Sequence, residues 1–260
     1  MDLKLSDKVV IVTGGAKGIG RGIVLALARE GAVPVIVGRR NVDNQLVKKE
    51  VEAMGGTAFC VEADLTRPED CERAVREAMA ATGRLDGLVN NAGVNDGVSL
   101  EHGSYTQFMD SLHKSLVHYY LMAHFALPAL KESKGSIVNI SSKTAETGQG
   151  GTSAYAAANG GRNALTREWA LELRKYSIRV NAVVVAECYT PQYETWIKTL
   201  PEPEEMLEKI TRRIPLGNRM TTVDEIADTT VFLLSERSSH TTGQLIHVDG
   251  GYVHLDRAID

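Results

Sequence analysis

The chain has 260 residues, of which 43% are hydrophobic and 24% are charged, and its formal net charge is −4. This balance is typical of a globular chain that buries a core, and the small negative charge gives no reason to expect nucleic acid or an anionic membrane as a partner. Cys60, Cys71 and Cys188 are scattered without a CxxC spacing, which argues against a metal site or a disulfide framework and fits a reducing cytosol.

The start of the chain lacks the apolar run of a signal peptide. No stretch approaches ~18 continuous apolar residues, so a transmembrane helix is not expected. We therefore expect a cytoplasmic protein.

Short apolar runs alternate with amphipathic segments along the whole chain. The runs are rich in β-branched residues and predict strands at 8–13, 34–37, 58–62, 87–90, 136–140, 179–185 and 245–248. Helices are predicted near 18–30, 43–54, 68–82, 105–132, 153–175 and 222–235. This alternation indicates a doubly wound, Rossmann-type α/β fold, in which a parallel sheet of about seven strands is flanked by helices in one domain over 1–260.

Residues 191–221 break this pattern because four prolines fall within them, Pro191, Pro201, Pro203 and Pro215. We interpret the segment as a lid over the substrate, and an ordinary surface excursion is an equally good reading.

A glycine-rich loop, Gly14-Gly15-Ala16-Lys17-Gly18-Ile19-Gly20, separates the first strand from the first helix. Glycines allow a tight turn and close approach of the backbone to a pyrophosphate, and the helix N-terminus offers free N–H groups. The loop therefore predicts a dinucleotide site that includes Gly14, Lys17, Gly18, Ile19 and Gly20.

The second strand ends in Gly38-Arg39-Arg40, where an acidic residue would select against a 2′-phosphate. Arg39 and Arg40, with Lys17 nearby, favour NADP over NAD. The alternative is that both arginines are solvated surface charges and that either cofactor binds.

The loop spacing resembles the TGxxxGxG loop of the short-chain dehydrogenase/reductase family. Further motifs follow in that family's order: Asp64-Leu65, the NNAG sequence at 90–93, Ser142 and Tyr155 separated by 13 positions, and the stretch 242–251. Within the family the chain is most similar to bacterial sugar dehydrogenases that oxidise L-fucose, on the stretches NNAGVNDG (90–97), NISSKTAETGQG (139–150), LTREWA (165–170) and HTTG (240–243).

The resemblance implies further cofactor contacts: Asp64, Leu65, Asn91, Ala92, Gly93, Tyr155, Asn159 and Thr190. It also implies that Tyr155 takes the substrate hydroxyl proton while Ser142 hydrogen-bonds the reacting oxygen. A free tyrosine has a pKa near ~10 and is a poor base at neutral pH. The family overcomes this with a lysine four residues after the tyrosine.

Two of the four expected catalytic positions depart from the family pattern. The lysine position holds Asn159, and an asparagine that holds a proton-relay water falls at Ser115. A unit charge ~4–5 Å away at an effective dielectric of ~20 is worth roughly 3–4 kcal/mol, and Asn159 cannot supply it. Lys143 or Arg162 could replace that charge in part, and the alternative is that both are surface or subunit-interface charges.

Polar residues and one tryptophan cluster where the family places its substrate: Asn95, Asp96, Ser142, Glu146, Gln149, Tyr155, Glu187 and Trp196. A sugar needs several directed hydrogen bonds, so this set favours a sugar or polyol over an acyl chain. The resemblance implies oxidation of an aldose to a lactone.

Two hypotheses remain open from the sequence. The chain is an NAD(P)-dependent sugar dehydrogenase, or it is a catalytically impaired nucleotide- or sugar-binding homologue. Apolar residues lie on more than one face of the helices predicted at 105–132 and 153–175, which favours a homotetramer or homodimer, with deep burial inside one chain as the alternative.

Overall fold

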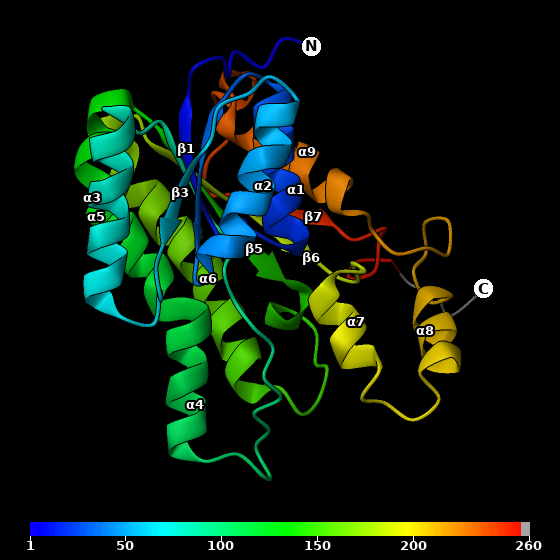
Figure 1. Cartoon of the computed structure of the whole chain (residues 1–260). Coiled ribbons are helices and arrows are strands. Elements are labelled where there is room, and N and C mark those ends of the chain that lie inside the picture. Colours follow the sequence, from blue (N-terminus) through cyan, green and yellow to red (C-terminus); the bar gives the residue numbers. More distant parts are fainter. Residues whose placement is uncertain (256–260) are drawn as a thin grey trace.

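The computed structural model describes residues 1–255. Seven strands form one parallel sheet in the order β3-β2-β1-β4-β5-β6-β7 (Figure 1). The strands are β1 (Val9–Thr13), β2 (Val33–Gly38), β3 (Phe59–Glu62), β4 (Gly87–Asn90), β5 (Ser136–Ser142), β6 (Arg179–Val185) and β7 (Leu245–Val248). The predicted Rossmann-type fold with about seven parallel strands is confirmed.

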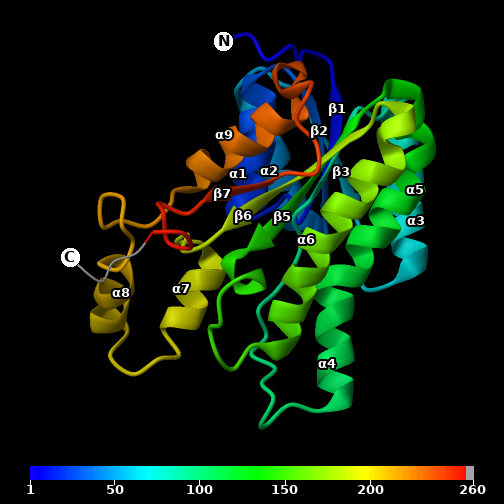
Figure 2. The same cartoon turned by 180° about the vertical axis from the view of Figure 1, so that it is seen from behind.

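Helices cover both faces of this sheet (Figures 1 and 2). One face carries α1 (Gly18–Arg29), α2 (Asn41–Ala53) and α9 (Val223–Leu234), and the other carries α3 (Pro68–Thr82), α5 (His118–Ser133) and α6 (Ser153–Leu173). The remaining helices are α4 (Tyr105–Leu112), α7 (Pro191–Ile197) and α8 (Pro203–Thr211). Single 3₁₀ turns lie at Lys143–Ala145, Arg174–Tyr176 and Glu236–Ser238.

Each strand in the middle of the sheet contributes to two hydrophobic cores. In β1, Val10 and Val12 pack toward α1 and α9, while Val9 and Ile11 pack toward α3 and α5. Because both faces are covered, the strand sequence is a continuous apolar run without polar alternation. The carboxyl ends of all seven strands consequently meet at one edge, where ligands bind in such sheets.

The helix predicted at 105–132 is divided. A capping box between Ser104 and Gln107 begins α4, and a π-helical turn at His113–Val117 then joins α4 to α5. A π-turn inserts one residue into the helical ladder and leaves carbonyl groups free for other partners. Ser115 lies in this turn.

The segment 191–221, which breaks the strand–helix alternation of the sequence, contains the two helices α7 and α8. Pro191 and Pro203 occupy the first turns of α7 and α8, where a missing N–H costs nothing. Among the described residues, no helix is long and apolar enough to cross a membrane.

Candidate functional site

The glycine loop after β1 is tied to the loop after β4. Thr13 Oγ1 accepts hydrogen bonds from the backbone N–H groups of Asn91 (2.9 Å) and Ala92 (3.1 Å), and the Asn91 amide donates to Thr13 O (2.9 Å). A Cβ at Gly20 would lie 2.1 Å from Gly14 O, so only glycine permits this turn. Both loops are thereby fixed side by side at the sheet edge.

The N-terminus of α1 is open to an anion. Its N-cap, Lys17, makes no side-chain capping hydrogen bond, and the first turn contains no acidic residue. The first N–H groups of α1 therefore need an external partner, which a phosphate supplies well. Thr190, the N-cap of α7, lies against Gly18, and a cleft of about 440 Å³ borders Lys17, Gly18 and Thr190. The arrangement fits a dinucleotide pyrophosphate.

The cations after β2 have an acidic neighbour that sequence reasoning missed. Asp43, in the first turn of α2, forms ion pairs with Lys17 (2.9 Å) and Arg40 (3.4 Å). The hydrogen bond from Lys17 and the charge of Arg40 hold the pKa of the Asp43 carboxyl below its usual value. Arg39 is exposed beside this group. The net charge of this group is therefore positive, but smaller than it would be without the carboxylate of Asp43.

Asp64 and Leu65 follow β3, as the resemblance requires. The Asp64 carboxylate accepts from the N–H (3.1 Å) and hydroxyl (2.8 Å) of Thr66, and its own backbone N–H donates to Asp70 (2.8 Å). Leu65 is buried in the core toward α3. These bonds fix the backbone of the turn at the sheet edge.

Ser142 and Tyr155 lie on elements that pack together. Ser142 ends β5 and accepts a hydrogen bond from the N–H of Thr144 (3.3 Å), in the 3₁₀ turn against which α6 packs. Tyr155 lies in the first turn of α6. Asn159 joins the two elements, because its amide donates to Thr144 Oγ1 (3.3 Å) and to Tyr155 O (2.9 Å).

Arg162 brings a buried cation to this site. The residue is 3% exposed, and its guanidinium carbon lies 4.3 Å from the ring centre of Tyr119 and 6.0 Å from that of Tyr155. The guanidinium donates to Asn159 Oδ1 (2.9 Å) and to Ile140 O (3.2 Å). Within residues 1–255 no carboxylate forms an ion pair with it, so its charge is not neutralised locally.

The π-turn provides the remaining partner of Arg162. Ser115 O accepts from both Nε (2.7 Å) and Nη2 of Arg162, while Ser115 Oγ exchanges hydrogen bonds with the N–H (3.2 Å) and carbonyl (3.1 Å) of Val94. A Cβ at Gly93 would lie 2.6 Å from Nη2, so this glycine makes room for the guanidinium. Positions 93 and 115 therefore shape the space that Arg162 occupies.

Lys143 is also buried, but it is directed elsewhere. Its ammonium forms an ion pair with Glu187 and lies 4.1 Å from the ring centre of Tyr252. Of the two cations considered from the sequence, neither is a surface charge of this chain, and Arg162 is the one placed near Tyr155.

The expected substrate residues take different positions. Asp96 accepts from Ser111 (2.7 Å) and pairs with Lys114 (3.6 Å), and Asn95 Oδ1 accepts from Gly97 N (3.4 Å). Glu146 contacts His247, Glu187 is buried against Lys143, and Gln149 is exposed. Trp196 is 37% exposed on α7 and packs edge-on against Tyr193.

Sequence reasoning missed Asp43, the two histidines His247 and His254, and Asn163, whose amide donates to Glu146 Oε1 (3.4 Å). Asp43 was detectable, because it follows Arg40 by three positions at the start of a predicted helix. The histidines carried no motif signal, because their contact with Glu146 arises only in the folded chain.

Comparison with known proteins agrees with this geometry. Residues 14–253 match the family model described as Enoyl-(Acyl carrier protein) reductase. The L-fucose dehydrogenase of Bos taurus is 37% identical over 96% of this chain and 91% of its own length. A solved structure described as Cj0485 dehydrogenase is 47% identical, has a TM-score of 0.93, and covers 100% of this chain and 99% of that chain. The aldohexose dehydrogenase of Thermoplasma acidophilum is 28% identical, with a TM-score of 0.90 and coverage of 100% and 99%. These relatives give no support to the impaired-homologue hypothesis.

Proposed function

Because the chain belongs to the short-chain dehydrogenase/reductase family and is an NAD(P)-dependent oxidoreductase, we propose that it oxidises the anomeric hydroxyl of an L-fucose-like aldose to the lactone. Two of the similar proteins are named for L-fucose and for aldohexoses, which supports an aldose substrate. The polar side chains near the sheet edge support the same class, since each sugar hydroxyl needs a directed partner.

The cofactor would be held by the glycine loop and the open N-terminus of α1, with Asn91, Ala92 and Gly93 beside it. When bound, the cofactor would supply the acceptor for the hydride that leaves the substrate carbon. Arg39, Arg40 and Lys17 favour a 2′-phosphate, and Asp43 reduces that preference. The proposal is NADP as the better cofactor, with NAD also accepted.

The proton follows a separate route through Tyr155. Its phenolate oxygen takes the proton of the anomeric hydroxyl as the carbon–hydrogen bond breaks, and Ser142 Oγ donates a hydrogen bond to the reacting oxygen. The substrate thereby loses a hydride and a proton, and its C1–O bond becomes the carbonyl of the lactone. Asn159, whose amide is buried and bonded to three neighbours, acts by holding Tyr155 and Arg162 in place.

The observation that carries this proposal is the cation of Arg162, 6.0 Å from the Tyr155 ring centre. Its positive charge has the sign that attracts the negative oxygen that forms on Tyr155 during the reaction. The proposed consequence is an active enzyme in which the charge of Arg162 takes over part of the role of the usual lysine.

The segment from Pro191 to Thr221 is proposed to close over the substrate. It begins beside the glycine loop at Thr190, and its Trp196 offers an apolar surface for one face of a sugar ring.

We also propose a homotetramer or homodimer. Tyr105 and Tyr120 are exposed on α4 and α5, while Tyr119, Met122 and Trp169 are buried within the chain. The mass in solution by light scattering tests the assembly.

Initial rates with L-fucose and related aldoses, NADP⁺ and NAD⁺, from pH 7 to 10.5 test the proposed function. We expect turnover that increases toward pH 10, a loss of at least about 10³-fold in kcat for Tyr155→Phe, and unchanged cofactor binding in that variant. Asn159→Lys is measured in parallel and should be faster near neutral pH. Cofactor binding without turnover of any aldose by either the unmodified protein or Asn159→Lys would contradict the proposal.

A further inference from the structure

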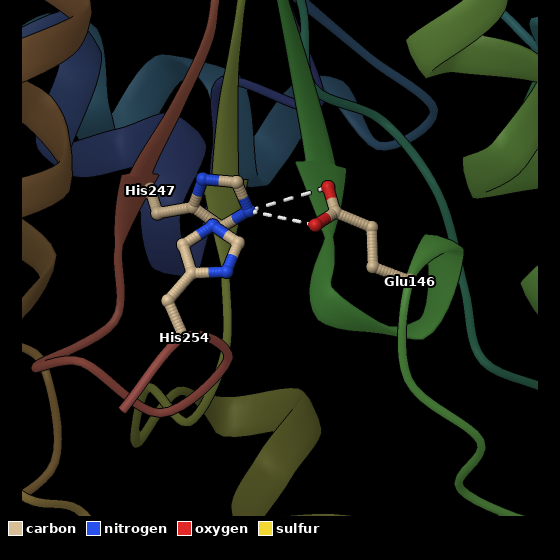
Figure 3. A group of neighbouring side chains, drawn as sticks. All are labelled: Glu146, His247 and His254. Atoms are coloured by element: carbon tan, nitrogen blue, oxygen red, sulfur yellow. Dashed lines mark hydrogen bonds and ion pairs between the residues drawn. The ribbon is translucent and has the colours of Figure 1, made fainter. Parts of the chain in front are cut away.

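Three metal-ligating side chains meet beside the carboxyl ends of β5 and β7 (Figure 3). Glu146 follows the 3₁₀ turn after β5, His247 lies in β7, and His254 lies seven residues further along the chain. One ligand atom from each, a carboxylate oxygen and two ring nitrogens, lies within 4.8 Å of the others. The fold thus brings together donors that are 101 and 108 positions apart in the sequence.

The distances are close to those of a metal-bound set. His247 Nε2 lies 3.1 and 3.2 Å from the two carboxylate oxygens of Glu146. Two ligand atoms each ~2.1 Å from a tetrahedral zinc ion are about 3.4 Å apart, so this pair needs little adjustment. The ring centres of His247 and His254 are 4.4 Å apart at 61°, and one ring nitrogen of the exposed His254 lies within 4.8 Å of the other two ligand atoms.

The carboxylate of Glu146 is oriented by groups behind it. Asn163 Nδ2 donates to Glu146 Oε1 (3.4 Å), and Asn163 Oδ1 accepts from the buried hydroxyl of Ser141 (2.6 Å). Outer partners of this kind fix the direction of a ligand and raise metal affinity. Lys143, the lysine nearest to Glu146 in the sequence, is paired with Glu187 and not with Glu146.

We propose that Glu146, His247 and His254 bind a divalent transition metal ion, with zinc as the metal that fits best. Two imidazoles and one carboxylate are a common zinc donor set, and three protein ligands leave the fourth position for water or a hydroxyl oxygen. The ion would link the loop before α6 to the segment after β7. The proposal does not depend on the identity of the sugar, and it concerns binding rather than turnover.

The test uses the full-length, untagged protein, stripped with EDTA and titrated with zinc chloride by calorimetry, with metal content measured after dialysis. We expect about one zinc ion per chain and a rise in Tm of about 5–10 °C when zinc is at 100 times Kd. His254→Gln and Glu146→Gln should each weaken binding by at least about 100-fold. The matched control is His240→Gln, which removes an exposed histidine outside the cluster and should bind zinc like the unmodified chain.

His254→Gln is the decisive variant, because its side chain is exposed and its loss leaves the core intact. Its Tm without zinc should equal that of the unmodified protein, and zinc should no longer raise it. Two results would overturn the proposal. One is that the unmodified protein binds no zinc at a zinc concentration of about 100 µM, and the other is that His254→Gln and His240→Gln bind zinc equally well. In that event Glu146 and His247 form a hydrogen-bonded pair only.

Discussion

Replacing Arg162 tests the electrostatic role proposed for it. Arg162→Met removes the charge and keeps most of the side-chain volume, whereas Arg162→Lys keeps a charge at the same position. The guanidinium carbon lies 6.0 Å from the Tyr155 ring centre. At an effective dielectric of ~20, a unit charge about 6 Å from the charge that develops in the transition state is worth roughly 3 kcal/mol, or about 100-fold in rate. We expect Arg162→Met to lose up to that factor in kcat at pH 7.5.

The comparison of the two variants separates the charge from the packing. Arg162→Lys keeps a positive charge at this position, so its kcat should remain close to that of the unmodified enzyme while the kcat of Arg162→Met falls. Both variants lose hydrogen bonds to Ser115 O and Ile140 O, which lowers Tm in each and provides the structural control. An equal loss of kcat in both variants would show that Arg162 only supports the fold, and would refute the electrostatic argument.

Three further changes have defined outcomes. Asp43→Asn removes the carboxylate between Lys17 and Arg40 and should raise the NADP⁺ over NAD⁺ ratio of kcat/KM by about 3- to 10-fold at low salt, an effect that 0.5 M salt should reduce. Burial and the charge of Arg162 lower the pKa of His118 to about 4. In the unfolded chain the pKa of this histidine has its ordinary value near 6.5, so the unfolded chain binds the proton at a higher pH than the folded one. The free energy of unfolding should therefore fall as pH drops from about 6.5 to 4. His118→Gln should remove up to about 3 kcal/mol of that pH dependence in urea unfolding, and an unchanged slope would contradict the assignment. Asn159→Lys places a second cation at the position where Asn159 Oδ1 accepts a hydrogen bond from Arg162. The two positive charges repel, so this variant should have a Tm several degrees lower even where its rate is higher. A Tm equal to that of the unmodified protein would contradict this expectation.

The sheet was predictable because its strands leave a simple signal. A parallel strand covered on both faces is a short, continuous run of β-branched residues, and runs such as Val9–Thr13 have no competing reading. The end of β5 was placed two residues early, since Ser141 and Ser142 are polar and belong to the site rather than to the core. The division between α4 and α5 was missed because a π-turn has no compositional signature and depends on what accepts its free carbonyls.

The site was predictable where motifs fix the backbone. It was unpredictable where the orientation of a long side chain depends on contacts that exist only in the folded chain. The glycine loop and Asn91 act through main-chain geometry, so their spacing was informative. Lys143 and Arg162 were equally plausible cations in the sequence, and their actual directions depend on Glu187 for one and on a carbonyl freed by the π-turn for the other. No spacing rule contains that information.

The departure from the family pattern at position 159 and the buried arginine form one arrangement. Asn159 accepts a hydrogen bond from Arg162, and the main-chain carbonyl at position 115, which any residue would provide, receives two more. A lysine at 159 would repel the guanidinium, and any side chain at Gly93 would displace it. Loss of the usual charge at position 159 and the presence of a charge at position 162 are therefore mutually consistent, which is the physical reason to expect a working base at Tyr155 rather than an inert remnant.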